Sequence, residues 1–241
     1  MNSDTPPDGV LLVDKAPDMT SHDVVAMVRR CLDTKKVGHC GTLDPMATGL
    51  LLVVIGRGTK IQDLLMSEDK EYVGELTLGS STSTQDRQGE ILEERPVPDD
   101  INADQLEAVF QKFHGDFYQV PPMVSAIKKD GVPLYKLARQ GKTVEREPRL
   151  VHVYSHEILE VQSPRVGFRV LCSKGFYVRT YAHDIGEELG CGAHLSQLRR
   201  TRSGHFTIEN SVPVALLKPD HREEVISHLL SLPAVSRLRG A

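Results

Sequence analysis

The sequence of 241 residues lacks several features that would assign it to well-known classes of protein. Its four cysteines, Cys31, Cys40, Cys172 and Cys191, form no C-x-x-C pair, so neither a disulfide framework nor a zinc site is indicated. It has no run of about eighteen apolar residues, and therefore no predicted transmembrane helix. The polar, acidic residues 1–8 lack the basic end and the apolar middle of a signal peptide. We therefore expect a cytoplasmic protein with free thiols and no membrane contact.

The charged residues that are present are distributed unevenly along the chain. Tryptophan is absent and aromatic residues reach only 5%, but apolar residues reach 39%, which is enough for an ordinary core. The net charge is −4, with thirteen acids against three bases between residues 63 and 110. Seven bases against three acids occur in each of the ranges 121–149 and 165–205. Basic segments beside an acidic flank fit a protein that binds a polyanion on one face, although ordinary solvated charge gives the same pattern.

The spacing of apolar residues predicts a chain of alternating strands and helices. Strands are predicted at residues 10–13, 50–55 and 71–78, with a hairpin at 151–161 and 166–172. Helices are predicted after Thr20 or Ser21, at 61–66, after Asn102 and at 181–189, and residues 214–232 are expected to be mostly helical. Residues 35–45 and 79–95 are predicted as loops, 119–149 as an irregular basic segment, 195–200 as a short element, and a final strand is expected from Phe206 onward.

One loop, VGHCGTLDPMATG at residues 37–49, stands out within this pattern. It places Asp44 among three glycines, which permit backbone angles that a Cβ would forbid, and directly before the apolar run 50–55. Pro45 fixes its own φ and pushes Asp44 toward an extended conformation. A carboxylate in such a loop cannot easily turn to solvent. For an isolated loop of this kind, a turn in which Asp44 caps neighbouring amides is the commoner interpretation, and a functional carboxylate is the alternative.

A longer pattern favours the functional interpretation. Residues 38–45 (GHCGTLDP) with 47–49 (ATG) resemble the catalytic-aspartate motif of the TruB family of RNA pseudouridine synthases. Further blocks match in the family's order: 9–15 (GVLLVDK) with Thr20 and Ser21, 70–72 (KEY), Leu78 and Gly79 with Thr82, Thr84, Asp86 and Gly89, 121–126 (PPMVSA) through 134–139 (LYKLAR), and 175–180 (GFYVRT). The resemblance extends from about Gly9 to about Leu217.

The resemblance implies an α/β (α+β) pseudouridine synthase fold, with a central, mainly antiparallel mixed sheet flanked by helices. It implies a catalytic domain at 9–217 with a basic, RNA-gripping insertion at about 119–149, preceded by a disordered tail at 1–8. Residues 218–241 are expected to form a short helical extension and no complete PUA-type module, which bacterial family members usually carry at the C-terminus. Ala16 and Asp18 stand where the family commonly has Pro and Gly, in a turn away from the chemistry.

The reaction implied by the resemblance breaks the C1′–N1 bond of a uridine, rotates the base and joins C1′ to C5. It involves no redox change and no net water. No cofactor and no metal are therefore expected, in agreement with the lack of ligand clusters and of a G-x-x-x-x-G-K-[ST] loop. Asp44 is expected to be the nucleophile or the base that starts elimination at the sugar. Arg179 is implied as its ion-pair partner, with a plain structural ion pair as the alternative.

Six further residues are implied near the site. Tyr72 is expected to stack on the unpaired base, worth ~1–3 kcal/mol, with proton transfer as a second role. His39 is expected to fill the space that the extruded uridine leaves. For these residues the alternative is an ordinary core or surface position. The remaining residues expected to bind substrate are Lys15, Lys60, Tyr177 and Leu198.

The sequence therefore predicts a monomeric, cofactor-free tRNA pseudouridine synthase that acts on uridine 55 in the TΨC stem-loop. The first alternative is a non-catalytic RNA-binding protein or tRNA chaperone on the same scaffold, which would tolerate loss of Asp44. The second is a sugar hydrolase, which usually needs two carboxyl groups about 5–10 Å apart. Asp14, Asp86 and Asp184 are the candidates for that second carboxyl group. The presence of Asp44 together with Arg179 favours the isomerase.

Overall fold

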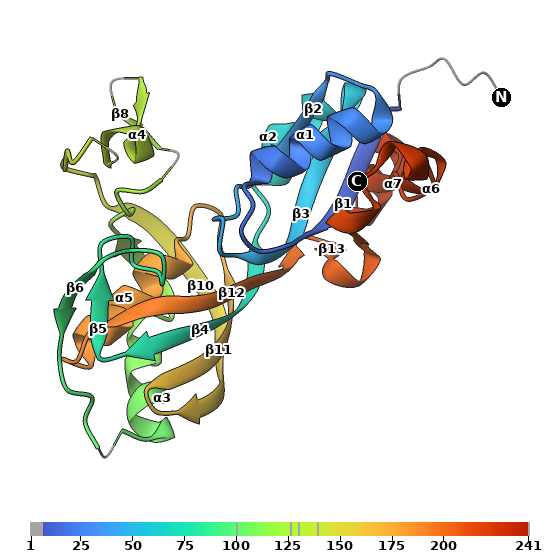
Figure 1. Ribbon diagram of the computed structural model, residues 1–241. Coiled ribbons are helices and arrows are strands. Elements are labelled where there is room, and N and C mark those ends of the chain that lie inside the picture. The colour runs from blue at the N-terminus through green and yellow to red at the C-terminus, as the bar shows by residue number, and fades with distance from the viewer. Residues whose placement is uncertain (1–6, 100, 126, 130, 139, 241) are drawn as a thin grey trace. The chain divides into compact units, whose positions relative to one another are not determined.

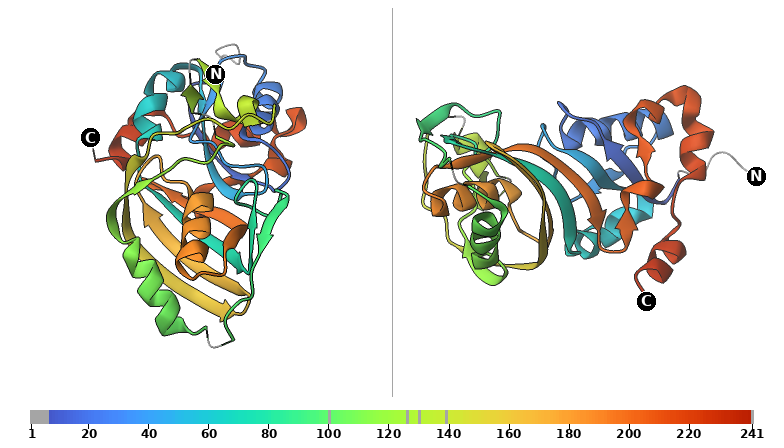
Figure 2. Two further views of the ribbon diagram at one scale, coloured as in Figure 1. Left: turned by 90° about the vertical axis from the view of Figure 1, so that its left-hand side faces the viewer. Right: turned by 90° about the horizontal axis from the view of Figure 1, so that it is seen from below.

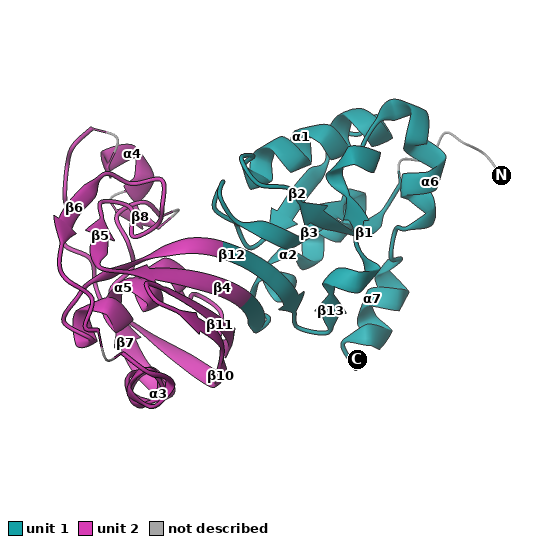
Figure 3. Cartoon of the chain, turned by 60° about the horizontal axis from the view of Figure 1, so that its bottom comes forward, with its two compact units in different colours: residues 1–72, 198–241 teal, residues 73–197 magenta. Residues whose placement is uncertain are grey.

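The computed structural model describes residues 7–99, 101–125, 127–129, 131–138 and 140–240, which divide into two compact units. Unit 1 consists of Met1–Tyr72 and Leu198–Ala241, and unit 2 of Val73–Gln197 (Figure 3). Unit 1 is thus discontinuous in sequence. The boundary falls inside two strands, β4 (Lys70–Leu78) and β12 (Ala193–Ser203). Each unit is described by itself below.

Unit 1 is built around β3 (Thr48–Ile55), whose apolar residues 50–55 are completely buried. β1 (Gly9–Lys15) pairs antiparallel with the whole of β3, from Gly9 opposite Ile55 to Lys15 opposite Gly49. On the other edge of β3, β2 (Val37–Cys40) pairs antiparallel with the second half and β12 pairs parallel with the start. The strand predicted at 50–55 is confirmed, and it is buried on both faces.

Helix α1 (Ser21–Leu32) begins after Thr20, one of the two predicted starts, and Thr20 forms a capping box with Asp23. Thr20 Oγ1 accepts a hydrogen bond from Asp23 N at 3.1 Å, and the Asp23 carboxylate accepts one from Thr20 N at 2.7 Å. The buried face of α1 carries Val24, Val25 and Val28 at helical spacing, as predicted. α1 lies beside β2 (Figure 1). After β3 follow the short helices η1 (Gly56–Ile61) and α2 (Gln62–Met66).

The C-terminal part of unit 1 packs onto β1. Leu230 bridges Val10 through two backbone hydrogen bonds of 3.0 and 2.9 Å, and Val225 and Val235 are buried. Residues 214–232 are mostly helical, as predicted, but they form short 3-10 and α-helical segments separated by turns. The elements after β12 are β13 (Phe206–Thr207), η2 (Ile208–Asn210), β14 (Val212–Pro213), η3 (Val214–Leu216), η4 (Pro219–His221), α6 (Arg222–Ser227) and α7 (Leu232–Leu238).

Unit 2 contains the strand order β12-β4-β11-β10-β7. The predicted hairpin is confirmed as β10 (Arg149–Gln162) and β11 (Arg165–Cys172), and β7 (Gly115–Gln119) pairs antiparallel with β10. Helices α3 (Ala103–Lys112) and α5 (Val178–Glu188) lie side by side on this part of the sheet (Figures 1 and 2). The rings of Phe110, Phe168 and Tyr181 join them, with centroids 5.7–5.9 Å apart.

The remaining elements of unit 2 are short. β8 (Lys128–Lys129), β9 (Val132–Pro133) and α4 (Leu134–Ala138) lie within the predicted basic insertion. β5 (Ser80–Thr82) and β6 (Ile91–Glu94) form an antiparallel hairpin in the range predicted as a polar loop. Every residue of β6 is exposed, so this strand has no alternation of apolar and polar residues by which the sequence could reveal it.

Three further predictions of element boundaries were wrong. The loop 35–45 includes β2, whose glycine and histidine hide the strand pattern. The short element at 195–200 is the middle of β12, a strand of eleven residues. The helix predicted from Tyr181 begins at Val178, because the distant Gln119 side chain bonds both backbone groups of Tyr177 at the N-cap.

The fold class is confirmed as mixed α/β, with a ten-stranded sheet and helices on it. β1–β14 and β3–β12 are parallel, whereas β1–β3, β2–β3 and the pairs that β10 makes with β7 and β11 are antiparallel. The first six residues of the predicted tail lie outside the described residues, and the Asp8 carboxylate accepts a hydrogen bond from Arg57 N at 2.6 Å. In the described part of the chain, no helix is long and apolar enough to cross a membrane.

Candidate active site

Asp44 lies half-buried in the loop between β2 and β3, and its neighbours on both sides are fixed. On one side, Leu43 N donates a 2.9 Å hydrogen bond to Ser21 Oγ, at the start of α1, and Ser21 Oγ donates to Leu43 O at 3.3 Å. On the other side, Asp18 N donates to Pro45 O at 2.9 Å. The carboxylate therefore projects from a backbone whose position is set by two other segments of unit 1.

The ammonium of Lys15 is the first of three buried cations around this loop. Lys15 is completely buried, and its Nζ donates to Ala16 O at 2.9 Å, Met19 O at 2.8 Å and Pro45 O at 3.1 Å. Burial lowers the pKa of Lys15 to about 8, and the nearby Asp44 charge acts in the opposite direction. Lys15 thus ties the β1–α1 turn to the residue that follows Asp44.

The guanidinium of Arg200, on β12, joins the two ends of the same loop. Its Nε donates to Leu50 O at 2.7 Å and its Nη2 to Gly41 O at 3.1 Å. Arg200 is 1% exposed. Gly49 has a φ of +98°, and a Cβ there would lie 2.3 Å from Arg200 O, so only glycine fits this close approach. The loop from Gly41 to Gly49 is therefore built around Arg200.

Sequence reasoning missed Arg200. It follows Leu198 by two residues on one strand, so the two side chains share a face, and both are buried. Recognition of β12 as a continuous strand would have placed the arginine on the buried side of Leu198. The Leu198 carbonyl also contacts the motif loop, accepting a hydrogen bond from Thr48 Oγ1 at 3.3 Å.

Lys70, the third buried cation, and Tyr72 share the buried face of β4. Lys70 Nζ donates to Met66 O at 2.7 Å and to Glu68 O. A Cβ on Gly41 would lie 3.8 Å from Lys70 Cε, which places Lys70 beside Gly41 of the motif loop. Tyr72 is 9% exposed. The strand predicted at 71–78 is confirmed, and its residues alternate between buried and half-buried positions.

His39 lies on β2, five residues before Asp44. Its ring meets the His22 ring edge-on, with centroids 5.3 Å apart, and Gln62 Nε2 donates to its carbonyl at 3.1 Å. Burial, aided by His22 and Arg200, lowers the pKa of His39 to about 4, so the ring is neutral at ordinary pH. Lys60 lies exposed on η1, the short helix after β3.

Arg179 and Tyr177 belong to unit 2, at the start of α5. Arg179 is 3% exposed, and it donates to Thr84 O at 3.0 Å and to Val124 O at 2.8 Å. Its Nε lies 3.8 Å from Asp86 Oδ2. Tyr177 N donates to Gln119 Oε1 at 2.8 Å. The guanidinium is thus held by carbonyl groups from two loops of its own unit.

The loop that supplies Thr84 is bonded within itself. Asp86 accepts hydrogen bonds from Thr82 Oγ1 at its carbonyl, 2.7 Å away, and from Thr84 Oγ1 at its carboxylate, 2.6 Å away. A Cβ on Gly89 would lie 2.6 Å from Thr84 N, so this position also needs glycine. The sequence block with Thr82, Thr84, Asp86 and Gly89 therefore builds one compact turn beside Arg179.

The three carboxylates considered for a hydrolase have other partners or surroundings. Asp14 receives two hydrogen bonds from Arg199, of 3.0 and 2.7 Å. Asp86 belongs to the turn beside Arg179. Burial, with the charge of Glu187, raises the pKa of Asp184 on α5 to about 6. Asp14 and Asp86 are thus structural groups.

The predicted site residues divide between the two units. Unit 1 contains Lys15, His39, Asp44, Lys60, Tyr72 and Leu198, and unit 2 contains Tyr177 and Arg179. Lys15 and the Asp44 loop are brought together within unit 1. The pairing of Asp44 with Arg179 stays a prediction. Among the described residues, no group of His, Cys, Asp and Glu side chains could hold a metal ion.

The fold and the aspartate loop together define a pseudouridylate synthase, and comparison with known proteins agrees. A family model described as "TruB family pseudouridylate synthase (N terminal domain)" matches residues 29–178, and one described as "tRNA pseudouridylate synthase B C-terminal domain" matches residues 179–231. The chain belongs to the TruB family of pseudouridylate synthases, and the predicted resemblance is confirmed.

Two relatives and one solved structure illustrate the similarity. The chain is 50% identical over 232 residues to tRNA pseudouridine synthase B of Opitutus terrae, covering 95% of this chain and 96% of that protein. It is 49% identical over 221 residues to the protein of the same name from Syntrophotalea carbinolica, covering 90% of this chain and 72% of that protein. A crystal structure of a Cbf5-Nop10-Gar1 complex matches with a TM-score of 0.70 and 34% identity over 92% of this chain. The chain spans 59% of that solved chain.

Proposed function

We propose that this protein converts uridine 55 in the TΨC stem-loop of tRNA into pseudouridine. The observation that carries the proposal is the Asp44 loop, whose backbone is bonded on both sides of the carboxylate. The proposal is supported by 50% identity, over almost the full length of both chains, to a relative named tRNA pseudouridine synthase B. A carboxylate held in this way meets the need of a reaction that requires one fixed anion and no external reagent.

In the proposed reaction, the C1′–N1 bond of the uridine breaks and the detached uracil rotates within the site. A bond forms between C1′ and C5, the C5 proton leaves, and N1 gains a proton, so that the composition of the nucleoside is unchanged although the C5 hydrogen is lost. Asp44 starts the sequence either by nucleophilic attack or by removing a proton from the sugar. Both routes need the carboxylate ionised and close to the sugar.

Each of the other residues has a role that suits its surroundings. Arg179, held by Thr84 O and Val124 O, supplies the guanidinium that pairs with Asp44. Tyr72 stacks on the target base, and the neutral ring of His39 occupies the space that the base leaves. Because Lys15 and Arg200 are buried and bonded to carbonyl groups, we assign both to positioning the loop instead of to contact with RNA.

The remaining residues complete the binding surface of the proposal. Tyr177 and Leu198 line the pocket for the base, Lys60 contacts the RNA backbone, and the basic insertion at 119–149 grips the stem-loop. The protein acts as a monomer in the cytoplasm and uses no cofactor. The proposal keeps the domain boundaries expected from the sequence. The catalytic part is 9–217 and the C-terminal extension is 218–241.

Tritium release from a tRNA transcript labelled at C5 of its uridines tests the proposal, because formation of the C1′–C5 bond expels that hydrogen. The purified protein should release tritium from one uridine, and mapping should locate pseudouridine at position 55. Asp44→Asn should bind the same RNA and release none. Binding without product in the unaltered protein would support the RNA chaperone, and product at a different uridine would overturn the substrate assignment.

A further inference from the structure

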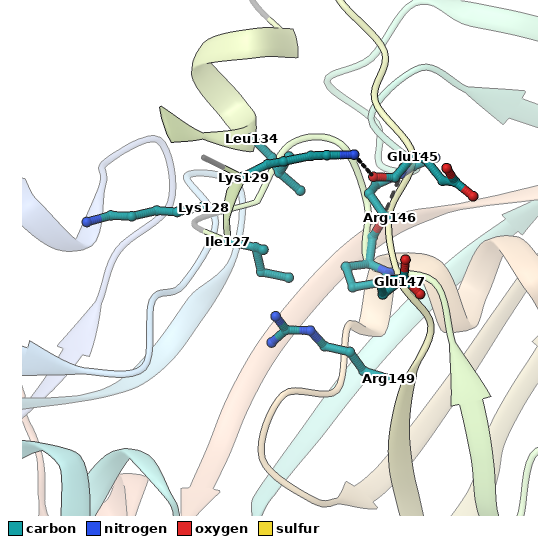
Figure 4. A pocket seen from close by; sticks show the side chains of 9 residues that line it. Ile127, Lys128, Lys129, Leu134, Glu145, Arg146, Glu147 and Arg149 are labelled. Atoms are coloured by element: carbon teal, nitrogen blue, oxygen red, sulfur yellow. Dashed lines mark hydrogen bonds between the residues drawn. The ribbon is translucent and has the colours of Figure 1, made fainter. Parts of the chain in front are cut away.

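A cavity of about 220 Å³ lies inside the basic insertion of unit 2. One wall carries Ile127, Lys128, Lys129 and Leu134 (Figure 4), and Pro121 also lines the cavity. The opposite wall is the segment that leads into β10, with the side chains of Arg146, Glu147 and Arg149 (Figure 4). The cavity therefore combines a hydrophobic surface with charged groups of both signs.

Hydrogen bonds between distant parts of the insertion hold these walls together. Leu134 N donates to Ile127 O at 2.8 Å, which closes the hairpin of β8 and β9 against α4. Lys129 Nζ donates to Glu145 O at 3.0 Å, and Arg146 Nη1 donates to Pro121 O at 3.2 Å. The cavity is thus bounded by segments that are bonded to one another.

Several polar groups at the cavity have no partner among the residues that the structure describes. The Arg149 guanidinium extends toward Ile127, while the Lys128 ammonium points away from the other side chains (Figure 4). Across the described residues, neither the Arg149 guanidinium nor the Glu147 carboxylate makes a hydrogen bond or an ion pair, and Arg146 Nε is buried without an acceptor. Donors and an acceptor are therefore free to contact a ligand.

The volume limits what this ligand can be. An apolar cavity of about 150 Å³ is large enough to bind benzene, and pockets for drug-sized molecules begin at about 300 Å³. At about 220 Å³, the cavity has room for one planar ring system but not for a whole nucleotide. A flat group with apolar faces and polar edges fits best.

The charges decide between the parts of an RNA that could enter. Four cations line the cavity, but Lys129 and Arg146 already donate to carbonyl groups and the Lys128 ammonium points away (Figure 4). A phosphate would therefore meet Arg149 together with the Glu147 carboxylate and the apolar side chains of Ile127 and Leu134, and the carboxylate and the apolar side chains disfavour an anion. A nucleobase would place its faces on Ile127 and Leu134. Guanine presents acceptors, O6 and N7, that a guanidinium binds with two parallel hydrogen bonds, and N–H donors that a carboxylate can accept.

We propose that this cavity binds one unpaired guanine base of the RNA, with Arg149 donating to its acceptor edge and Glu147 accepting from its N–H groups. This inference rests on the proposed function, because it takes the substrate to be an RNA with unpaired bases. The proposed function assigns the basic insertion at 119–149 to gripping the stem-loop. The present inference gives that insertion a contact with one specific base, away from the target uridine.

A double-mutant cycle between protein and RNA tests the proposal. The dissociation constant of a full-length tRNA transcript is measured for the unaltered protein, Arg149→Ala and Glu147→Gln. Each is repeated with transcripts in which one unpaired guanine at a time is made abasic or replaced by inosine, which lacks the N2 amino group. Lys142→Ala is the matched control, since Lys142 is an exposed cation of the same insertion that does not line the cavity.

We expect one guanine whose removal weakens binding to the unaltered protein about tenfold, as for the loss of one stacked base. Arg149→Ala should weaken binding to the intact transcript by a similar factor. When the variant is combined with the transcript that lacks this guanine, the dissociation constant should rise by less than about threefold beyond that of either single change. Inosine at that position should weaken binding to the unaltered protein but not to Glu147→Gln. Lys142→Ala should weaken binding by the same factor with every transcript.

Other results would overturn the inference. If Arg149→Ala weakens binding equally for all transcripts and reduces the salt dependence by about one phosphate contact, the cavity reads no base. The same conclusion follows if no single guanine matters. If Arg149→Ala does not fold, the comparison of guanine with inosine in the unaltered protein and in Glu147→Gln still tests the proposal, because it measures binding without that variant. Absence of pseudouridine with the unaltered protein would instead count against the proposed function, so the two failures are distinguishable.

Discussion

The motif loop Gly41–Gly49 and the basic insertion at 121–149 use positive charge in opposite ways. Around the motif loop, Lys15, Lys70 and Arg200 are buried, and they donate to backbone carbonyl groups. In the insertion, Arg149 and Lys142 are exposed. One set of cations fixes the protein's own backbone, and the other remains available to a partner.

The difference shows what each region requires. Burying a charge costs several kcal/mol, and each hydrogen bond to a charged group contributes about 1.5–3 kcal/mol in the other direction. Three buried cations around one loop therefore cost much free energy, which their hydrogen bonds offset while they fix the position of the loop. A reacting carboxylate needs such a fixed position, since a displacement of about 1 Å can cost 10²-fold in rate. A binding surface gains more from side chains that are free to adjust to the RNA.

The largest expected effect concerns Asp44. Asp44→Asn keeps the shape of the side chain and removes its negative charge, so we expect turnover of the tRNA to fall by at least about 10³-fold. The dissociation constant for the RNA should stay within about threefold. Tritium release and a filter-binding assay on the same preparation measure both. Residual turnover above about a tenth of normal would show that another group carries the reaction.

Arg200→Gln tests whether the loop must be held at both ends. We expect kcat to fall roughly 10²-fold while the dissociation constant for RNA changes little, because Gly41 O and Leu50 O lose the donor that joins them. The rate is referred to the folded fraction measured by circular dichroism. Arg200→Lys should recover part of kcat, since an ammonium can reach one of the two carbonyls.

The control for this experiment is Arg202→Gln on the same strand. Arg202 is half-buried, and its Nη2 lies 3.8 Å from Glu71 Oε2. It should keep kcat within about twofold. Equal losses of kcat in the Arg200 and Arg202 variants would attribute the effect to the strand as a whole and would remove the contrast between the fixed loop and the adaptable insertion.

His39 gives a smaller effect with a defined pH signature. His39→Ala should lower kcat/KM about tenfold through loss of one stacked ring, and His39→Phe should stay close to the unaltered protein. With a folded-state pKa of about 4 against an ordinary value of 6.5, the contribution of His39 to stability is fully present above pH 6.5 and is lost as the pH falls toward 4. Urea unfolding between pH 4 and 7 measures this loss, which His39→Phe should abolish.

The smallest effect is an alkaline decrease in rate that depends on Lys15. Above its pKa of about 8, the neutral amine keeps two hydrogens for three carbonyl acceptors, so kcat should fall about two- to threefold between pH 7 and 9. Stability should change in the opposite direction. The unfolded chain, with a lysine pKa of about 10.4, binds more protons above pH 8, and the free energy of unfolding should therefore rise. Lys15→Met should remove both trends.

Much of unit 1 could be predicted because its signals are local. The buried strand β3 follows from six consecutive apolar residues, and α1 follows from the N-cap at Thr20 or Ser21 and the helical spacing of the valines after it. The family motif around Asp44 was equally local. What the sequence did not reveal were the long-range contacts. Arg200 acts on a loop about 150 residues away in sequence, and no local pattern marks that partnership.

In unit 2, the elements that the sequence missed had weak local signals. The start of α5 depends on Gln119, which lies 58 residues from Tyr177, so the boundary was placed three residues too late. β6 is exposed throughout and has no apolar face to recognise. The cavity in the insertion arises because Arg146 and Lys129 bond across a chain reversal, which composition alone does not specify.

The discontinuity of unit 1 has a consequence for how the protein is made. A ribosome adds about 5–20 residues per second, so many seconds separate the synthesis of Met1–Tyr72 from that of Leu198–Ala241. During that interval β1 and β3 lack β14, β12 and the contact of Leu230 with Val10. Their apolar surfaces are therefore exposed in the nascent chain until its last fifth emerges. Asp44 is synthesised early, but the hydrogen bonds of its loop to Arg200 can form only after Arg200 has left the exit tunnel.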